Sequence, residues 1–136
     1  MLIRHCRRDD LDALEWDGAF THDRDIIRDT FAHAATGTMI MLVAEEDGSI
    51  VGQLWIDLAR YPKVAYVWAV RVRPVHRTHG LATHLLAEAE RIGASHACAY
   101  AELDVDADNV RAVELYARLG YREVRRDGFI RMRKSL

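Results

Sequence analysis

Apolar and polar residues alternate along several short stretches of the chain, and this two-residue period predicts β-strands. Residues 2–7 show it first, and the β-rich runs 38–46 and 49–59 flank Asp47-Gly48, which predicts a hairpin. The other predicted strands cover residues 64–72, residues 96–105, and a final hairpin over 121–133 that turns at Asp127-Gly128. In the 64–72 strand, which Pro74 ends, the residues expected to share one face are Val64, Tyr66, Trp68, Val70 and Val72.

Helical spacing separates these strands. Residues 7–20 predict a helix that begins at Asp9 or Asp10 and turns Leu11 and Leu14 inward, and residues 21–37 predict a second helix that ends at Gly37. The expected inner stripe of the second helix consists of Ile26, Ile27, Thr30 and Phe31. A third helix ends at Gly93, and its expected inner stripe consists of Leu81, Leu85, Leu86 and Ala89. A fourth helix over 109–120 stops at Gly120. The order β-α-α-β-β-β-α-β-α-β-β predicts an α/β fold with a mixed sheet.

Length and composition favour one soluble globular domain over residues 1–136, since no repeat or Pro/Gly/Ser-rich linker divides the chain. A formal charge of −2 gives no general attraction to nucleic acid or to an anionic membrane. The segment 1–10 has charges where a signal peptide needs an apolar run, and no stretch has the length of a membrane span. Cys6 and Cys98 form no C-x-x-C pair, so we expect buried, reduced thiols and a cytoplasmic location.

Residues 72–86 combine a strand end, a basic loop and a helix start. The first turn of a helix has unpaired backbone N–H groups that bind anions, Gly80 lets a phosphate approach the backbone, and Arg77 adds a positive charge. The pattern Arg77-x-x-Gly80-x-Ala82 therefore predicts a diphosphate site, although the spacing alone fits a plain glycine at a helix start equally well. His76, His79 and His84 lie nearby, but no Cys, Asp or Glu of the segment completes a metal site, so no metal is expected.

Two motifs resemble those of the GNAT superfamily of acetyl-CoA-dependent N-acetyltransferases. The first is Val72-Arg73-Pro74 followed by Arg77-Thr78-His79-Gly80-Leu81-Ala82, and the second is Asn109 followed by Leu115-Tyr116-x-x-x-Gly120-Tyr121. The predicted order of elements matches that fold over nearly the whole chain. The resemblance implies a mostly antiparallel sheet that is splayed at its fourth strand, and acetyl-CoA as the co-substrate. Thr78 stands where the family often has glycine.

The resemblance also implies roles for individual residues. The backbone of Val70, Arg71 and Val72 would pair with the pantetheine arm, and an N–H near Val70 would stabilise the oxyanion. The diphosphate would lie on the loop and first helical turn, residues Arg77, Thr78, His79, Gly80, Leu81, Ala82 and Thr83, with Asn109 contacting the coenzyme while capping its own helix. Tyr116, protonated at neutral pH, would give a proton to the departing thiolate, although it also fits a core position of an amphipathic helix.

The general base has several candidates. In the N-terminal-amine branch of the family a carboxylate precedes the tyrosine by twelve residues, and here that position is Asp104. Glu102 and Asp57 are the reserve candidates, and an acidic strand end that faces solvent explains Asp104 without any catalytic role.

By resemblance, the acceptor binds at the junction of the two N-terminal helices. Glu15 and Asp17 are acidic there, and Trp16 and Phe20 are aromatic, a combination that suits a small cationic amine. A peptide N-terminus is the alternative acceptor, and a non-catalytic acyl-CoA-binding module is the alternative class of protein. The oligomeric state, monomer or homodimer, stays open.

Overall fold

The computed structural model describes residues 1–77 and 80–136, so the predicted contributions of Thr78 and His79 lie outside the described residues. Its strands form one sheet in the order β1-β2-β3-β4-β5-β7-β6. Their bounds are Leu2–His5 (β1), Met39–Glu46 (β2), Ser49–Asp57 (β3), Val64–Val72 (β4), Tyr100–Asp106 (β5), Arg122–Arg126 (β6) and Phe129–Ser135 (β7). The β4–β5 pairing is parallel, and every other neighbouring pair is antiparallel. The predicted mixed α/β fold is confirmed.

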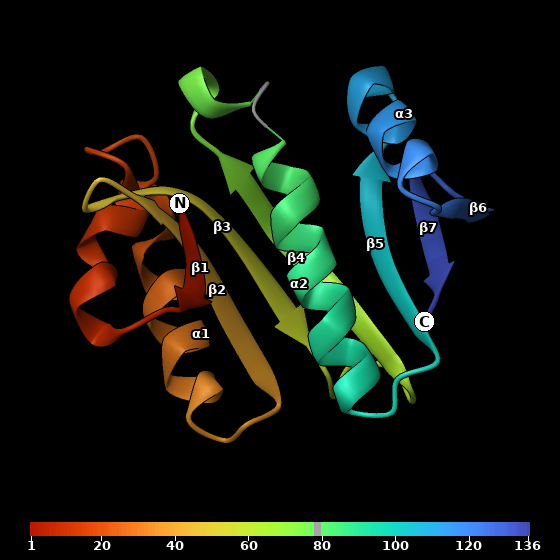
Figure 1. Ribbon diagram of the computed structural model, residues 1–136, viewed down its shortest axis with the longest axis horizontal. Helices are drawn as coiled ribbons and strands as arrows, with labels where there is room; N and C mark the ends of the chain where they lie inside the picture. The colour runs from red at the N-terminus through yellow and green to blue at the C-terminus, as the bar shows by residue number, and fades with distance from the viewer. Residues whose placement is uncertain (78–79) are drawn as a thin grey trace.

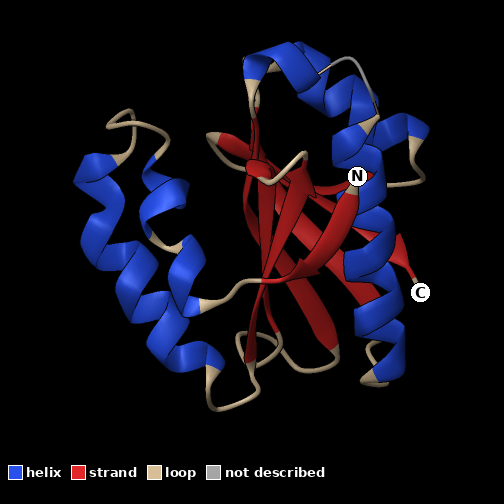
Figure 2. Cartoon of the chain, turned by 60° about the vertical axis from the view of Figure 1, so that its left-hand side comes forward, coloured by secondary structure: helices blue, strands red, loops and turns tan. Residues whose placement is uncertain are grey.

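The α-helices cover both faces of this sheet (Figures 1 and 2). They are α1 (Arg24–Ala34), α2 (Leu81–Ser95) and α3 (Val110–Arg118). Residues of α2 and α3 pack on one face, which we call the α2 face, and α1 packs on the other, the α1 face. The predicted inner stripe of α2 is confirmed, because Leu81, Leu85, Leu86 and Ala89 are all buried there. Among the described residues, no helix is both long and apolar enough to cross a membrane.

The predicted helix over residues 7–20 is wrong. Two 3-10 turns, Arg8–Asp10 and Asp12–Glu15, stand in its place and still bury Leu11 and Leu14. The reason lies in the side chain of Asp10, which accepts hydrogen bonds from the Arg7 backbone N–H at 2.6 Å and from Arg4 at 2.7 Å. Those contacts hold the first turn tight. The segment then ends at Trp16 and Asp17, whose φ angles of 47° and 57° interrupt any helix.

The predicted inner stripe of the next helix is also partly wrong. Ile27 and Thr30 of α1 are buried and Phe31 is partly buried, but Ile26 is 51% exposed. The α1 helix begins at Arg24, after a separate 3-10 turn over Thr21–Asp23.

The strand β4 contains a bulge that the alternation pattern did not predict. Ala69 has a φ of +54°, and the pairing of β3 with β4 shifts register between Gln53 and Trp55. As a result Trp68 packs on the α1 face whereas Val70 and Val72 pack on the α2 face. The expectation that five alternate residues from Val64 to Val72 share one face is therefore wrong, because the extra residue changes the phase of the strand.

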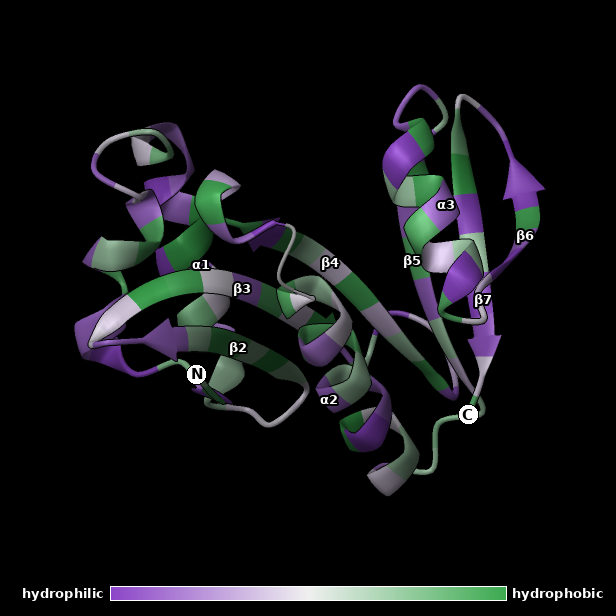
Figure 3. Cartoon of the chain, turned by 45° about the horizontal axis from the view of Figure 1, so that its top comes forward, coloured by the Kyte–Doolittle hydropathy of each residue, from purple (hydrophilic) through white to green (hydrophobic). Residues whose placement is uncertain are grey.

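The strands β4 and β5 diverge, as the resemblance implied. They pair from Val64↔Tyr100 to Val67↔Leu103, and no pairing between them continues over residues 68–72. Figure 3 shows the wedge between the two strands beyond their paired ends. Along this stretch the backbone groups of β4 that point away from β3 have no strand partner.

Candidate functional site

A cavity of about 810 Å³ opens where β4 and β5 diverge. It is lined by the end of β4, the start of α2, one side of α3 and part of the N-terminal segment, namely Trp16, Phe20, Val70, Arg71, Val72, Arg77, Gly80, Ala82, Thr83, Asn109, Arg111, Ala112, Leu115, Tyr116, Arg118 and Leu119. This volume lies within the usual range for sites that hold small molecules or cofactors. We call it the main cavity.

The charge of the main cavity has one sign. Arg71, Arg77, Arg111 and Arg118 line it, and no Asp or Glu is present among its described lining residues. Arginine pairs with phosphate through a planar, bidentate array of donors. The cavity is therefore electrostatically suited to an anion with several phosphate groups.

The start of α2 supplies the backbone part of the predicted diphosphate site. Gly80 is the N-cap of α2 and has a φ of +72°, a left-handed conformation that L side chains rarely adopt. The amide groups of the first α2 turn, which includes Ala82 and Thr83, have no partner inside the helix. Arg77 lies beside this turn, where its Nε donates to the Val72 carbonyl at 3.2 Å. Leu81 points the other way, into the core.

The helix α3 places the two predicted residues of the second motif on the cavity wall. The Asn109 side chain accepts a hydrogen bond from the Ala112 N–H at 3.2 Å and so caps α3 while lining the cavity. Tyr116 lies about two turns further along α3 and is half-buried. Its ring centre lies 6.1 Å from that of Tyr121. Burial raises the pKa of the Tyr116 phenol, and no hydrogen bond to its hydroxyl occurs within the described residues. Tyr116 is thus protonated at neutral pH and free to donate.

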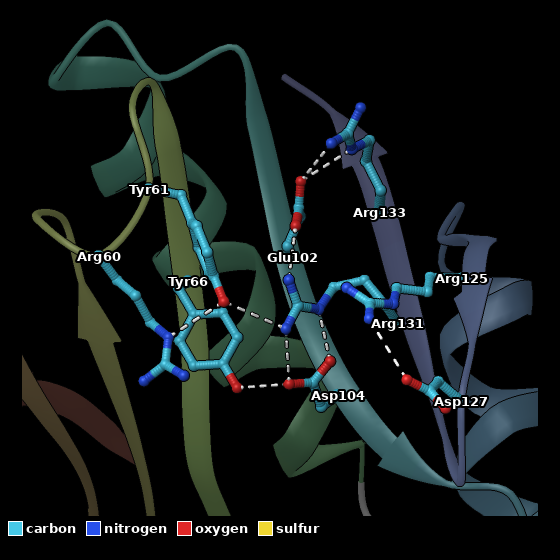
Figure 4. Close-up of polar contacts among 9 residues, drawn as sticks. All are labelled: Arg60, Tyr61, Tyr66, Glu102, Asp104, Arg125, Asp127, Arg131 and Arg133. Atoms are coloured by element: carbon cyan, nitrogen blue, oxygen red, sulfur yellow. Dashed lines mark hydrogen bonds and ion pairs between the residues drawn. The ribbon is translucent and has the colours of Figure 1, made fainter.

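Asp104, the predicted base, lies on the other face of the sheet from Tyr116 and does not line the main cavity. Its carboxylate accepts hydrogen bonds from Tyr66 at 2.7 Å and from Arg131 at 3.0 Å (Figure 4). Burial works to raise the pKa of Asp104, but these two partners outweigh burial and hold the pKa below its ordinary value. The base role stays a prediction, and a carboxylate held ionised in this way is a weak proton acceptor.

The reserve candidates are engaged as well. Glu102 is buried and pairs with Arg133 and Arg131 at 2.6 and 3.5 Å. Asp57 ends β3 and accepts hydrogen bonds from the backbone of Ala59 and Arg60, which organises the turn that follows. Neither residue is among those lining the main cavity.

The N-terminal junction is predicted to hold a cationic acceptor, but its groups contact arginines of the chain itself. Glu15 pairs with Arg24 at 2.9 Å, and this contact lowers the pKa of Glu15. The Arg71 guanidinium lies 3.7 Å from the ring centre of Phe20 and 5.1 Å from that of Trp16. Asp17 is exposed and lies 3.8 Å from Arg73. These contacts use much of the negative charge and aromatic surface that a cationic substrate would need.

Gln53 is the residue of this region that the sequence analysis did not identify. It is fully buried on β3, its amide Nε2 donates to the Ala69 carbonyl at 2.9 Å, and its Oε1 accepts from Arg71 Nη2 at 2.9 Å. Gln53 thus holds both the β4 bulge and the Arg71 side chain. A glutamine within an apolar strand was the available signal, because a buried amide needs partners.

Comparison with known proteins agrees with this geometry. Residues 5–121 match the family model described as the acetyltransferase (GNAT) family, and the chain belongs to that family. Over 79 residues it is 37% identical to a mycothiol acetyltransferase of Streptomyces griseus subsp. griseus, a match that covers 58% of this chain. The chain spans about a quarter of the length of the curated relatives it matches, 26% for this one.

Solved structures show the same fold. The PaiA N-acetyltransferase of Thermoplasma acidophilum, in complex with coenzyme A, superposes with a TM-score of 0.87 at 16% identity, and covers 99% of this chain and 98% of that one. A ribosomal-protein-alanine N-acetyltransferase of Brucella melitensis gives a TM-score of 0.85 at 20% identity, with full coverage of both chains.

Within the described residues, no cluster of three or more His, Cys, Asp or Glu side chains could hold a metal ion.

Proposed function

We propose that this chain is an N-acetyltransferase that uses acetyl-CoA to acetylate a primary amine. The observation that carries the proposal is the main cavity. Arginines but no Asp or Glu occur among its described lining residues, and it joins the open first turn of α2 to the unpaired edge of β4. The family membership and the coenzyme A complex of the Thermoplasma relative support it.

The residues of the main cavity fit coenzyme A by their chemistry. Arginine side chains and the amides after Gly80 match the charge of phosphate groups, and Ala82 and Thr83 are small enough for a close approach to the backbone. The unpaired edge of β4 around Val70 and Val72 offers hydrogen bonds to the amide groups of a pantetheine arm. The arginines, the first turn of α2 and the edge of β4 therefore supply donors along the whole length of a long, phosphate-bearing ligand.

Bound acetyl-CoA would supply the acetyl group as a thioester. In our proposal the acceptor amine, in its neutral form, attacks the carbonyl carbon; the C–N bond forms, the C–S bond breaks, and Tyr116 gives its phenolic proton to the sulfur. Backbone N–H groups on the free edge of β4 near Val70 stabilise the negative oxygen of the tetrahedral state, an effect typically worth about 3–4 kcal/mol for one donor. The amine proton goes to water or to Asp104 through water.

A peptide N-terminus is a second acceptor class, and the Brucella relative, named as a ribosomal-protein-alanine N-acetyltransferase, is the reason to test it. The proposed location is the cytoplasm, because Cys6 and Cys98 are both free, and unpaired thiols suit a reducing compartment.

Release of free thiol from acetyl-CoA, measured against a panel of amines and peptides, tests the proposal. Loss of the proton donor in Tyr116→Phe is expected to lower kcat by about 100-fold or more while calorimetry shows unchanged binding of coenzyme A. Tyr100→Phe is the matched control, since Tyr100 is half-buried on β5 outside the main cavity. Tight coenzyme binding without thiol release from any acceptor would instead identify a non-catalytic acyl-CoA-binding module.

A further inference from the structure

Gln53 is a fully buried amide in the middle of an apolar strand. The residues beside it on β3, Gly52 and Leu54, are apolar and buried as well. A buried amide is tolerated only where its hydrogen bonds are made, and an apolar residue would fill the same place without that requirement. Gln53 is not among the described residues that line the main cavity, so contact with coenzyme A does not explain it. Its partners within the chain indicate what it does.

The amide nitrogen of Gln53 binds the backbone of β4 at the bulge. Nε2 donates to the Ala69 carbonyl at 2.9 Å. Ala69 is the residue of β4 with a φ of +54°, and the register of β3 with β4 shifts opposite it. A side chain of β3 therefore holds this carbonyl at the point where the regular pairing of the two strands is interrupted.

The Ala69 carbonyl belongs to the same peptide unit as the Val70 N–H. This unit is planar and trans, so its C=O and N–H bonds point in opposite directions. The hydrogen bond from Gln53 holds the carbonyl on the β3 side. The Val70 N–H therefore points the other way, toward the wedge between β4 and β5, where Val70 lines the main cavity.

The strand pairing next to the bulge agrees with this direction. The Arg73 N–H donates to the Val51 carbonyl at 2.9 Å. Hydrogen bonding alternates along an antiparallel pair, so Arg73 and Arg71 direct their backbone groups toward β3, whereas Val70 directs its N–H away from it. The pairing of β4 with β5 ends before Val70, so β5 does not take up this N–H.

The direction of this peptide unit depends on the side chain that holds it. Alanine rarely adopts a positive φ, so the backbone alone favours rotation of the Ala69–Val70 unit back to regular strand geometry. The other end of the amide fixes how Gln53 itself is turned. Its Oε1 accepts from Arg71 Nη2 at 2.9 Å, and because a guanidinium can only donate, Nε2 is the atom left for the carbonyl.

We propose that Gln53 is a positioning residue for acetyl transfer: through the Ala69 carbonyl it aims the Val70 N–H at the thioester oxygen. This inference rests on the proposed acetyltransferase function. As the amine attacks, the electron pair of the carbonyl π bond moves onto that oxygen, and a donor that is already in place stabilises the new charge. Gln53 acts through the peptide unit and not by contact with a substrate.

Gln53→Glu tests the inference with the smallest change of shape. Beside the Arg71 guanidinium the new carboxylate stays ionised, so it keeps a partner for Arg71 but has no proton for the Ala69 carbonyl. The kcat of thiol release from acetyl-CoA should fall by about 30-fold or more, since loss of an entire oxyanion donor costs roughly 100- to 1,000-fold. The KM for acetyl-CoA should stay within about threefold, because the donor acts mainly in the transition state.

The acetyl carbonyl of bound acetyl-CoA gives a readout that does not depend on turnover. With an NMR-active carbon isotope at this position, the carbon signal moves downfield when the oxygen accepts a hydrogen bond. The wild type should show this displacement in the absence of an acceptor, and Gln53→Glu should show a signal nearer to that of free acetyl-CoA. Ile27→Val, in the buried cluster of the α1 face, is the matched control for a general loss of packing and should leave kcat and the signal unchanged.

Gln53→Met loses both hydrogen bonds without adding a charge, and it serves if Gln53→Glu fails to fold. A folded variant that keeps the wild-type kcat and carbonyl signal would overturn the inference, while turnover by the wild type would leave the proposed function standing. A rise in KM at unchanged kcat would also overturn it. A signal that depends on Gln53, without turnover of any acceptor, supports the inference and refutes the proposed transfer. A wild type that binds no acetyl-CoA refutes both.

Discussion

Replacement of Gln53 by methionine tests how strongly the β4 bulge is held. Methionine has nearly the same length, so packing is kept while both hydrogen bonds at 2.9 Å are lost. The Ala69 carbonyl, which lies outside the strand register, then has no partner, at a cost of about 1–3 kcal/mol. Arg71 loses a charge-assisted bond worth about 1.5–3 kcal/mol but keeps its bond to the Leu14 carbonyl. The expected loss is about 3–5 kcal/mol of the free energy of unfolding.

Urea denaturation followed by circular dichroism and tryptophan fluorescence measures this loss by linear extrapolation. Two of the three tryptophans, Trp55 and Trp68, pair with each other beside the β4 bulge and report on its packing. Glu114→Met, at an exposed position of α3, is the control and should change the free energy of unfolding by no more than about 0.5 kcal/mol. A loss below about 1 kcal/mol in Gln53→Met would refute the view that Gln53 holds the bulge.

Three further outcomes follow from other parts of the structure. Gly80→Ala introduces a side chain at a φ of +72° where no atom lies within 4 Å, so urea denaturation should show a loss of about 1–2 kcal/mol from backbone strain alone; no loss would mean that the loop relaxes. Burial, with a smaller effect of the Asp10 charge, raises the pKa of Cys6 to about 12. Alkylation of Cys6 at pH 8 should therefore be far slower in the folded protein than in urea. The free energy of unfolding should also fall as the pH rises from 9 toward 12, because the thiol ionises more easily in the unfolded chain. Equal alkylation rates in the two states would contradict the burial of this thiol. The pKa of Asp104 is lowered in the folded protein, so its contribution to stability is present above the ordinary pKa of 3.8 and is lost as the pH falls through the lower folded value. Asp104→Asn should therefore lower Tm more at pH 7 than at pH 3. Equal losses of Tm at both pH values would show that the ion pair contributes nothing.

Local signals explain why much of the fold could be predicted. The hairpin turns Asp47-Gly48 and Asp127-Gly128 have glycines at positive φ, and α2 starts directly after Gly80, where the sequence predicted a helix start. The cap at Asn109 likewise follows from residue type, because its side chain bonds an amide only three residues away. Each of these features is decided by neighbours in the sequence.

The features that were missed depend on contacts between distant segments. Asp104 meets Tyr66 across 38 residues, and this contact depends on the parallel register of β4 with β5. The bulge at Ala69 has no signal in its residue type, since alanine rarely adopts a positive φ. Its stabilising partner, Gln53, lies 16 residues earlier on the adjacent strand. Periodicity alone therefore could not place the phase change that divides β4.

That phase change determines which residues of β4 face the main cavity. In a regular β4, Trp68 and Val70 would lie on the same face, and Arg71 would point to the opposite face, toward the core beneath α2. With one extra residue at Ala69, Val70 lies on the α2 face beside the main cavity, while the side chain of Arg71 reaches the N-terminal segment and donates to the Leu14 carbonyl. In the proposed reaction, coenzyme A on the free edge of β4 and an acceptor beside the N-terminal segment would then meet at adjacent residues, Val70 and Arg71. A transfer between them requires this proximity, so the bulge, rather than any single side chain, sets the geometry of the proposed reaction.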